Sequence, residues 1–231
     1  MNLFDYLFVE SCRICRKFIV DSSSQAKTLC ADCWAPLAAQ TAQLDSCAIS
    51  NADSIMVAHA TAYEKTMKQL IYKLKYDSDR LIAHDLGFLL VKAYLVLKEE
   101  MQANCITGEF TPQLVPVPLS QWRLIKRGFN QAEMLAKELK RRELLPVASK
   151  LLRRRKHTKA QHKLNKQERA FNLQNAFICS TEKIATKNAD FILVDDIHTS
   201  GATLSEAAQT LLSAGANSVS AITVSRAILL H

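Results

Sequence analysis

The stretch that most constrains this chain runs from residue 191 to residue 203. Phe191 to Val194 are apolar without interruption, which predicts a strand buried on both faces of a parallel sheet. Asp195 and Asp196 follow at the carboxyl end of that strand, the edge at which open α/β sheets bind ligands. Thr199 to Thr203 then offer hydroxyls, a permissive glycine and the first amides of a predicted helix, which together suit a phosphate. Carboxylates that accept from vicinal hydroxyls, next to a phosphate cradle, predict a phosphorylated ribose as the ligand.

Every residue of the predicted cradle is a candidate phosphate contact: Thr199, Ser200, Gly201, Ala202 and Thr203. The plain alternative is that the two acids cap a helix and that Thr-Ser-Gly only turns the chain. His198 lies inside the motif and has the chemistry of a general base, but a side chain that only projects beside the loop is the favoured interpretation.

Two Cys-x2-Cys pairs lie near the amino terminus, Cys12 with Cys15 and Cys30 with Cys33, separated by 14 residues. That spacing is close to the spacing of a four-cysteine zinc ribbon. Four thiolates close a tetrahedron around one ion, so the predicted zinc is structural. A redox Cys-x-x-Cys and coincidence are the alternatives. The other three cysteines are isolated and are interpreted as small core residues.

The remaining chain alternates predicted strands and helices, which predicts an α/β fold with a parallel sheet and helices on both faces. Strands are expected near residues 54–61, 114–118, 172–179, 191–194 and 219–224, and helices near 63–74, 80–100, 132–139 and 204–211. We expect a zinc-ribbon-like head at residues 1–50 and the α/β domain at 51–231, with residues 38–51 as the connection. Lys75 and neighbouring lysines are expected on a solvated face, and His59 and His84 have no partner identifiable from sequence.

The chain has 231 residues and a net charge of +8, but its positive charge is local. Residues 140–169 hold twelve basic and two acidic side chains, a net +10, so the rest of the chain sums to −2. Such a block predicts a polyanionic ligand, either nucleotide or nucleic acid. Its candidate DNA-binding residues are Arg153, Arg154, Arg155, Lys156, Lys159 and Lys163.

No apolar run is long enough to span a bilayer, and residues 1–10 do not resemble an export signal, so we expect a cytoplasmic protein without membrane insertion. The short strand at 114–118 is interrupted by prolines, which predicts that it leads into a site loop. Pro116 and Val117 of this loop, with Arg123 and Arg127 after it, are candidate diphosphate contacts.

The motif from Val194 to Thr203 resembles the signature of type I phosphoribosyltransferases, which binds phosphoribosyl pyrophosphate (PRPP). Together with the paired cysteines, Pro116-Val-Pro-Leu, Arg127-Gly-Phe-Asn-Gln and Thr158-x-x-Gln-x-x-Leu leading to Arg169-x-x-Asn, it resembles the ComF family of competence proteins over nearly the whole chain.

This resemblance implies that Asp195 and Asp196 contact the PRPP ribose, that the cradle holds the 5′-phosphate, and that residues 115–120 form a pyrophosphate loop. Residues 153–169 would form a hood over the diphosphate, and Mg²⁺ would accompany PRPP. The implied role is the handling of incoming single-stranded DNA in natural transformation, with a helicase-like ComF protein as partner. The alternative is an active phosphoribosyltransferase of nucleotide metabolism, although no general base or acceptor segment is identifiable.

Overall fold

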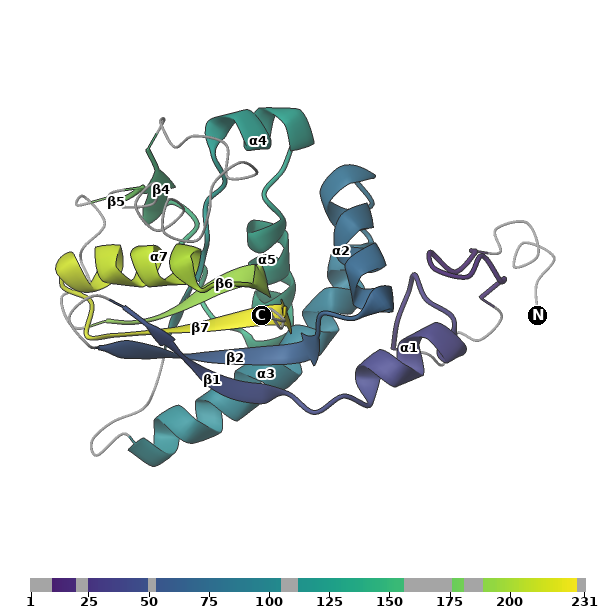
Figure 1. Cartoon of the computed structure of the whole chain (residues 1–231), viewed down its shortest axis with the longest axis horizontal. Helices are drawn as coiled ribbons and strands as arrows, with labels where there is room; N and C mark the ends of the chain where they lie inside the picture. Colours follow the sequence, from purple (N-terminus) through teal and green to yellow (C-terminus); the bar gives the residue numbers. More distant parts are fainter. Residues whose placement is uncertain are drawn as a thin grey trace.

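The computed structural model describes residues 10–19, 25–49, 53–104, 112–155, 176–180 and 189–227. Its centre is a five-stranded sheet in the order β1-β2-β7-β6-β3, flanked by helices (Figure 1). The strands are β1 (Gln43–Ala48), β2 (Ser54–Ala62), β3 (Gln113–Pro116), β6 (Asp190–His198) and β7 (Ser218–Arg226). Only β1 runs antiparallel to its neighbour; the pairs β2–β7, β7–β6 and β6–β3 are parallel. The predicted α/β fold with a mainly parallel sheet is confirmed.

Helices cover both faces of the sheet because the strand residues alternate between two apolar layers. Ile192 and Val194 of β6 belong to one core cluster, while Phe191 and Leu193 belong to the other. The helices are α2 (Lys65–Tyr76), α3 (Ile82–Asn104), α4 (Gln121–Arg127), α5 (Gln131–Glu143) and α7 (Ala202–Ser213). Helices α3 and α5 pack with the first cluster and α7 with the second, so β6 is buried on both sides, as its uninterrupted apolar run predicts.

The prediction that residues 38–51 only connect two parts of the chain is wrong in one respect. Residues 43–48 form β1, which pairs with β2 from Gln43 opposite His59 to Ala48 opposite Ser54. Only Cys47 of this strand is well buried, because β1 is an edge strand, and this explains the weak apolar pattern. The division into domains at residue 50 stays a prediction; keeping β1 with its sheet would move the boundary to about residue 42.

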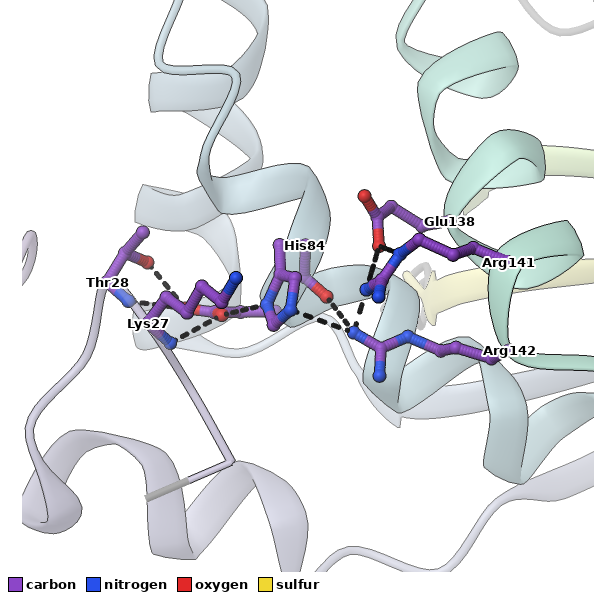
Figure 2. A network of polar contacts seen from close by, with 7 residues as sticks. Lys27, Thr28, His84, Glu138, Arg141 and Arg142 are labelled. Carbon is purple, nitrogen blue, oxygen red and sulfur yellow. Dashed lines mark hydrogen bonds and ion pairs between the residues drawn. The ribbon is translucent and has the colours of Figure 1, made fainter. Parts of the chain in front are cut away.

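The head (residues 10–19 and 25–38 of the described chain) packs on α3 through α1 (Ala31–Ala38). The rings of Trp34 and Phe88 meet edge to face with centroids 5.8 Å apart. A polar network continues this contact into α5 (Figure 2). Asp85 is fully buried and accepts from the Lys27 amide at 2.8 Å and from both the amide and hydroxyl of Thr28.

His84 carries the network onward, so this histidine has partners that sequence did not identify. Arg142 only donates, and it contacts His84 Nε2 at 3.3 Å, so Nε2 is the accepting nitrogen. The Nδ1 proton is then available to Asp85 Oδ1, 3.0 Å away. The head, α3 and α5 are therefore joined by one hydrogen-bonded chain (Figure 2).

Asp85→Ala is expected to lower the free energy of unfolding by about 3 kcal/mol, because the buried amide and hydroxyl of Thr28 and the partly buried amide of Lys27 lose their acceptor. Urea denaturation measures this change, and hydrogen exchange should show lost protection at residues 25–38. Asp77→Ala is the control, since Asp77 is exposed and pairs only with Lys73, an interaction worth about 0–1 kcal/mol. Equal losses in the two variants would contradict the structural role of Asp85.

A second, two-stranded sheet pairs β4 (Leu152–Arg154) with β5 (Phe177–Cys179). Residues 156–175, which hold most of the basic block, lie outside the described chain. Within the ranges that the structure describes, no helix has the length and apolar character required to cross a bilayer.

Candidate phosphoribosyl site

The two acids of the motif lie in the carboxyl half of β6, which continues past the predicted end at Val194 to His198, and Asp196 forms an ion pair with α2. Asp196 is 4% exposed and pairs with the Lys75 ammonium group. Burial raises the pKa of Asp196, but the charge and hydrogen bond of Lys75 outweigh it, so the net pKa lies below its ordinary value. Burial and the neighbouring Asp196 charge raise the pKa of Asp195 well above its ordinary value. The expectation that Lys75 belongs to a solvated face is wrong, because helical phase turns it toward β6.

Arginines from two segments, α4 and β4, lie around these carboxylates. Arg127, at the end of α4, interacts electrostatically with both acids, and burial lowers its pKa. Arg154 of β4 interacts with Asp195 and with Arg123, and burial lowers its pKa as well. Half-buried guanidinium groups favour anionic ligands, because solvent screens the attraction between opposite charges less there than at the open surface. Arg123 and Arg127, the predicted diphosphate contacts, therefore lie near Arg154, a residue of the basic block.

The proline-containing loop lies directly beside β6. The amide of Val117 donates to the carbonyl of Val194 at 3.0 Å, and Asn130 Nδ2 donates to the carbonyl of Val117 at 3.1 Å. Asn130 Oδ1 also accepts from the Ala132 amide and so caps α5. Pro116, the last residue of β3, is paired in register with Val194. The loop is thus fixed next to Asp195 by backbone contacts on two sides.

The predicted phosphate cradle forms the turn between β6 and α7. Gly201 has φ 76°, a left-handed conformation that favours glycine, and precedes Ala202, the first residue of the helix. A Cβ at Gly201 would lie 2.6 Å from Cys47 Sγ and 3.0 Å from His198 Nε2, so the turn has no space for a side chain. Thr199 and Ser200 are exposed. Residues 199–202 line a cavity of about 280 Å³ that β1 closes with residues 46–48, and Ser205 and Arg226 complete its wall.

Two buried histidines form part of this site, and sequence reasoning missed their relation. His198 Nδ1 lies 3.3 Å from His59 Nε2, and the same Nε2 lies 3.0 Å from Asp45 Oδ2. Strand alternation did place His59 on a strand, but only the order β2-β7-β6 brings it onto the same face as His198. His59 therefore has partners that could not be identified from the sequence.

The four head cysteines, Cys12, Cys15, Cys30 and Cys33, form a cluster in which all sulfurs lie within 4.8 Å of one another. A tetrahedral zinc with Zn–S bonds of about 2.3 Å requires sulfur separations of about 3.8 Å, so this cluster can hold a metal ion. Burial raises the pKa of Cys12, but amide hydrogen bonds from Cys15, Cys30 and Ile14 outweigh it and lower the pKa to about 6.

The candidate DNA-binding residues divide into two groups. Arg153 and Arg155 of the β4 segment are exposed, whereas Arg154 is half-buried and turned toward the acids. Lys156, Lys159 and Lys163 lie outside the described residues. The structure therefore separates Arg154 from the other arginines of the block.

No family model matches the chain. It is 31% identical over 209 residues to the DNA utilization protein YhgH of Escherichia coli, covering 90% of this chain and 86% of that protein. Competence protein F of Haemophilus influenzae is 30% identical over 165 residues, covering 71% and 70% of the two chains. Competence protein ComFC of Bacillus subtilis is 41% identical over 114 residues, or 49% of this chain and 44% of that protein. The resemblance drawn from the motifs is confirmed, and the chain belongs to the ComF family.

Proposed function

We propose that this protein takes part in DNA uptake by handling single-stranded DNA and that it binds PRPP with Mg²⁺ at the carboxyl edge of its sheet. The names of its relatives, which refer to competence and DNA utilization, support the first part. The side chains around β6 support the second part.

The main support for the phosphoribosyl site is that β6 and the turn after it place a ribose-binding acid pair next to a phosphate-binding turn. Asp195 and Asp196 accept from the ribose hydroxyls, and residues 199–203 receive the 5′-phosphate at the amino terminus of α7. Arg127 and Arg154 lie on the side where the diphosphate would extend. Mg²⁺ would bridge the diphosphate and ribose largely through ligand and water oxygens. Lys75 balances the charge of Asp196 until the ligand arrives.

A group of exposed rings also supports nucleic-acid binding. We call it the aromatic surface; it consists of Tyr72 and Tyr76 of α2 and Trp122 of α4. All three rings are exposed, and Trp122 is 68% exposed. Lys126 lies over Trp122 at 5.2 Å, and Arg127 lies over Tyr76 at 5.5 Å, which connects the two helices. Rings interleaved with cations suit single strands, because bases stack on the rings while phosphates pair with the charges. The basic block holds few aromatics, and this surface supplies them from elsewhere in the sequence.

Trp122→Ala is expected to weaken binding of an oligothymidine about tenfold, because stacking contributes about 1–3 kcal/mol per base. Fluorescence anisotropy at low and moderate salt measures this affinity. In the wild-type protein, base stacking should also quench the fluorescence of Trp122. The fluorescence of Trp34 should change little on DNA binding, because Trp34 is buried. Phe18→Ala is the matched control, since Phe18 is an exposed ring on the head.

Wild-type affinity should fall steeply with salt, and replacement of Arg153, Arg155 and Lys156 by alanine should reduce that slope. An affinity that does not depend on salt, or equal affinities for the Trp122 and Phe18 variants, would contradict DNA binding at this surface.

Three finer features belong to the same proposal. The ion held by the four cysteines is zinc with a structural role, since four thiolates leave no open coordination position. The protein acts in the cytoplasm with a helicase-like ComF partner. An active phosphoribosyltransferase is the second candidate, favoured by the arginines around the acids, and pyrophosphate release from PRPP with a nucleobase or amine would support it.

A further inference from the structure

The acid pair and the aromatic surface meet at the carboxyl end of α2. Lys75 and Tyr76 are consecutive residues at this end of the helix. Lys75 pairs with Asp196, whereas the centre of the exposed Tyr76 ring lies 5.5 Å from the guanidinium carbon of Arg127 in α4. The ring of Tyr72 lies 4.8 Å from that of Tyr76 and extends the surface along α2. The two proposed binding sites are therefore neighbours.

Arg127 lies on the border between these two sites. Its Nη1 donates to Oε1 of Gln131, a side chain that is 4% exposed, so a buried acceptor holds the guanidinium group in place. Gly128, in a left-handed conformation, ends α4 directly after Arg127. Arg127 is half-buried and interacts electrostatically with both Asp195 and Asp196. One guanidinium group therefore contacts a ring of the aromatic surface and attracts the acid pair.

The cations next to Arg127 belong to one site or the other. Lys126 lies over the Trp122 ring at 5.2 Å, on the aromatic surface, whereas Lys75 is paired with Asp196. The charge of Arg127 is available both to a diphosphate beside the acids and to a DNA phosphate beside the rings. Two anions next to one half-buried cation repel each other, because solvent screens them less than at the open surface. A single guanidinium group therefore cannot serve both ligands fully at the same time.

We propose that PRPP and single-stranded DNA bind antagonistically, with Arg127 as the anion-binding residue that the two sites share. The inference rests on the proposed function and adds regulation to it. A diphosphate next to Arg127 neutralises the cation that would pair with a DNA phosphate, and its negative charge repels the strand. Filling the phosphoribosyl site therefore promotes release of single-stranded DNA, and bound DNA lowers the affinity for PRPP by the same factor.

Fluorescence anisotropy of an oligothymidine tests the antagonism, with and without saturating PRPP in the same concentration of Mg²⁺. The ionic strength is kept equal, because DNA affinity by itself falls as salt is added. PRPP is expected to raise the dissociation constant of the oligothymidine about tenfold, within the range of about 5–150-fold that is usual for coupled sites. Calorimetric titration of PRPP into protein saturated with the oligothymidine should show an equal loss of affinity. An unchanged or higher DNA affinity in the presence of PRPP would overturn the inference.

Arg127→Gln tests the shared residue, because glutamine keeps a polar side chain but has no charge. This variant should bind each ligand more weakly on its own and should reduce the coupling to less than about twofold. Lys126→Gln is the matched control: it should weaken DNA binding, leave the PRPP affinity unchanged and retain the coupling of the wild type. Coupling of wild-type size in Arg127→Gln would overturn the role of Arg127. Thermal unfolding checks that both variants are folded, and the wild-type titrations test the antagonism independently of them.

The same titrations separate this inference from the proposed function. If the wild type binds both PRPP and the oligothymidine, but each with an affinity that the other does not change, only the antagonism is wrong. If the wild type does not bind PRPP, the phosphoribosyl site is wrong and the inference fails with it. If it does not bind the oligothymidine, the proposed DNA binding is wrong and the inference fails as well.

Discussion

Replacing Asp195 and Asp196 together by alanine is expected to reduce the affinity for the proposed ligand, PRPP with Mg²⁺, by at least about 100-fold. Each carboxylate would accept a charge-assisted hydrogen bond from a ribose hydroxyl, and each such bond contributes about 1.5–3 kcal/mol. Two losses of this size correspond to about two to four powers of ten in the dissociation constant. The double variant also leaves Lys75 without its carboxylate partner in a half-buried position, so its charge would oppose Mg²⁺. Calorimetric titration measures this effect directly.

Asp190→Ala is the matched control for this experiment. Asp190 begins the same strand, but it lies at the opposite edge of the sheet, where it accepts from Ser218 Oγ and Asn217 Nδ2. Its replacement should change stability slightly and leave the PRPP affinity unchanged. Unchanged binding in the Asp195 and Asp196 double variant, or equal losses in the control, would show that the acids do not form the ribose site.

Removing the metal from the head is expected to unfold it locally while the sheet stays folded. Freshly purified protein should contain about one zinc per chain, and small zinc domains derive about 10 kcal/mol or more of their folding free energy from the ion. Cys12→Ser or Cys33→Ser should therefore abolish zinc binding and the exchange protection of residues 11–19 and 25–38. Amides of β6 and β7 should keep their protection, because these strands are buried between α3 and α5 on one face and α7 on the other, while the head cysteines Cys12, Cys30 and Cys33 belong only to the first of the two clusters.

Cys179→Ser is the control for the metal experiment, since Cys179 ends β5 and lies outside the cysteine cluster. It should retain zinc and the protection of the head. Metal analysis and hydrogen exchange measured by mass spectrometry give both readouts. Zinc near zero in the unchanged protein, or a head that stays protected after zinc is lost, would rule out a structural metal.

The sheet and its ligand edge were predictable because local sequence encodes them strongly. Phe191 to Val194 are apolar on both sides of the strand, so only a doubly covered sheet can bury them. Gly201 follows the acids at the spacing that a turn into α7 requires, and its positive φ confirms that use. The paired cysteines were likewise predictable, because the Cys-x2-Cys spacing alone places two sulfurs where they can bind the same ion.

Edge strands and side-chain convergence were not predictable in the same way. β1 has one well-buried residue, so its sequence has no clear alternation, and only its pairing with β2 identifies it as a strand. The rotation of α2 about its axis decides whether Lys75 faces solvent or Asp196. Because α2 has several lysines, the sequence did not show which of them would face the acids. The partners of His59 come from strands that are far apart in sequence.

The sequence by itself determined the α/β class, the position of the acids before the phosphate cradle, and the cysteine cluster, because each depends on residues within about 20 positions of one another. The tertiary structure alone decided that Lys75, Arg127 and Arg154 lie around the acids, and that Asp45 and His59 lie beside His198. The physical reason is the order of the strands: β1, β2, β7 and β6 are neighbours in the sheet, so residues more than 100 positions apart in sequence come into contact on one face of it.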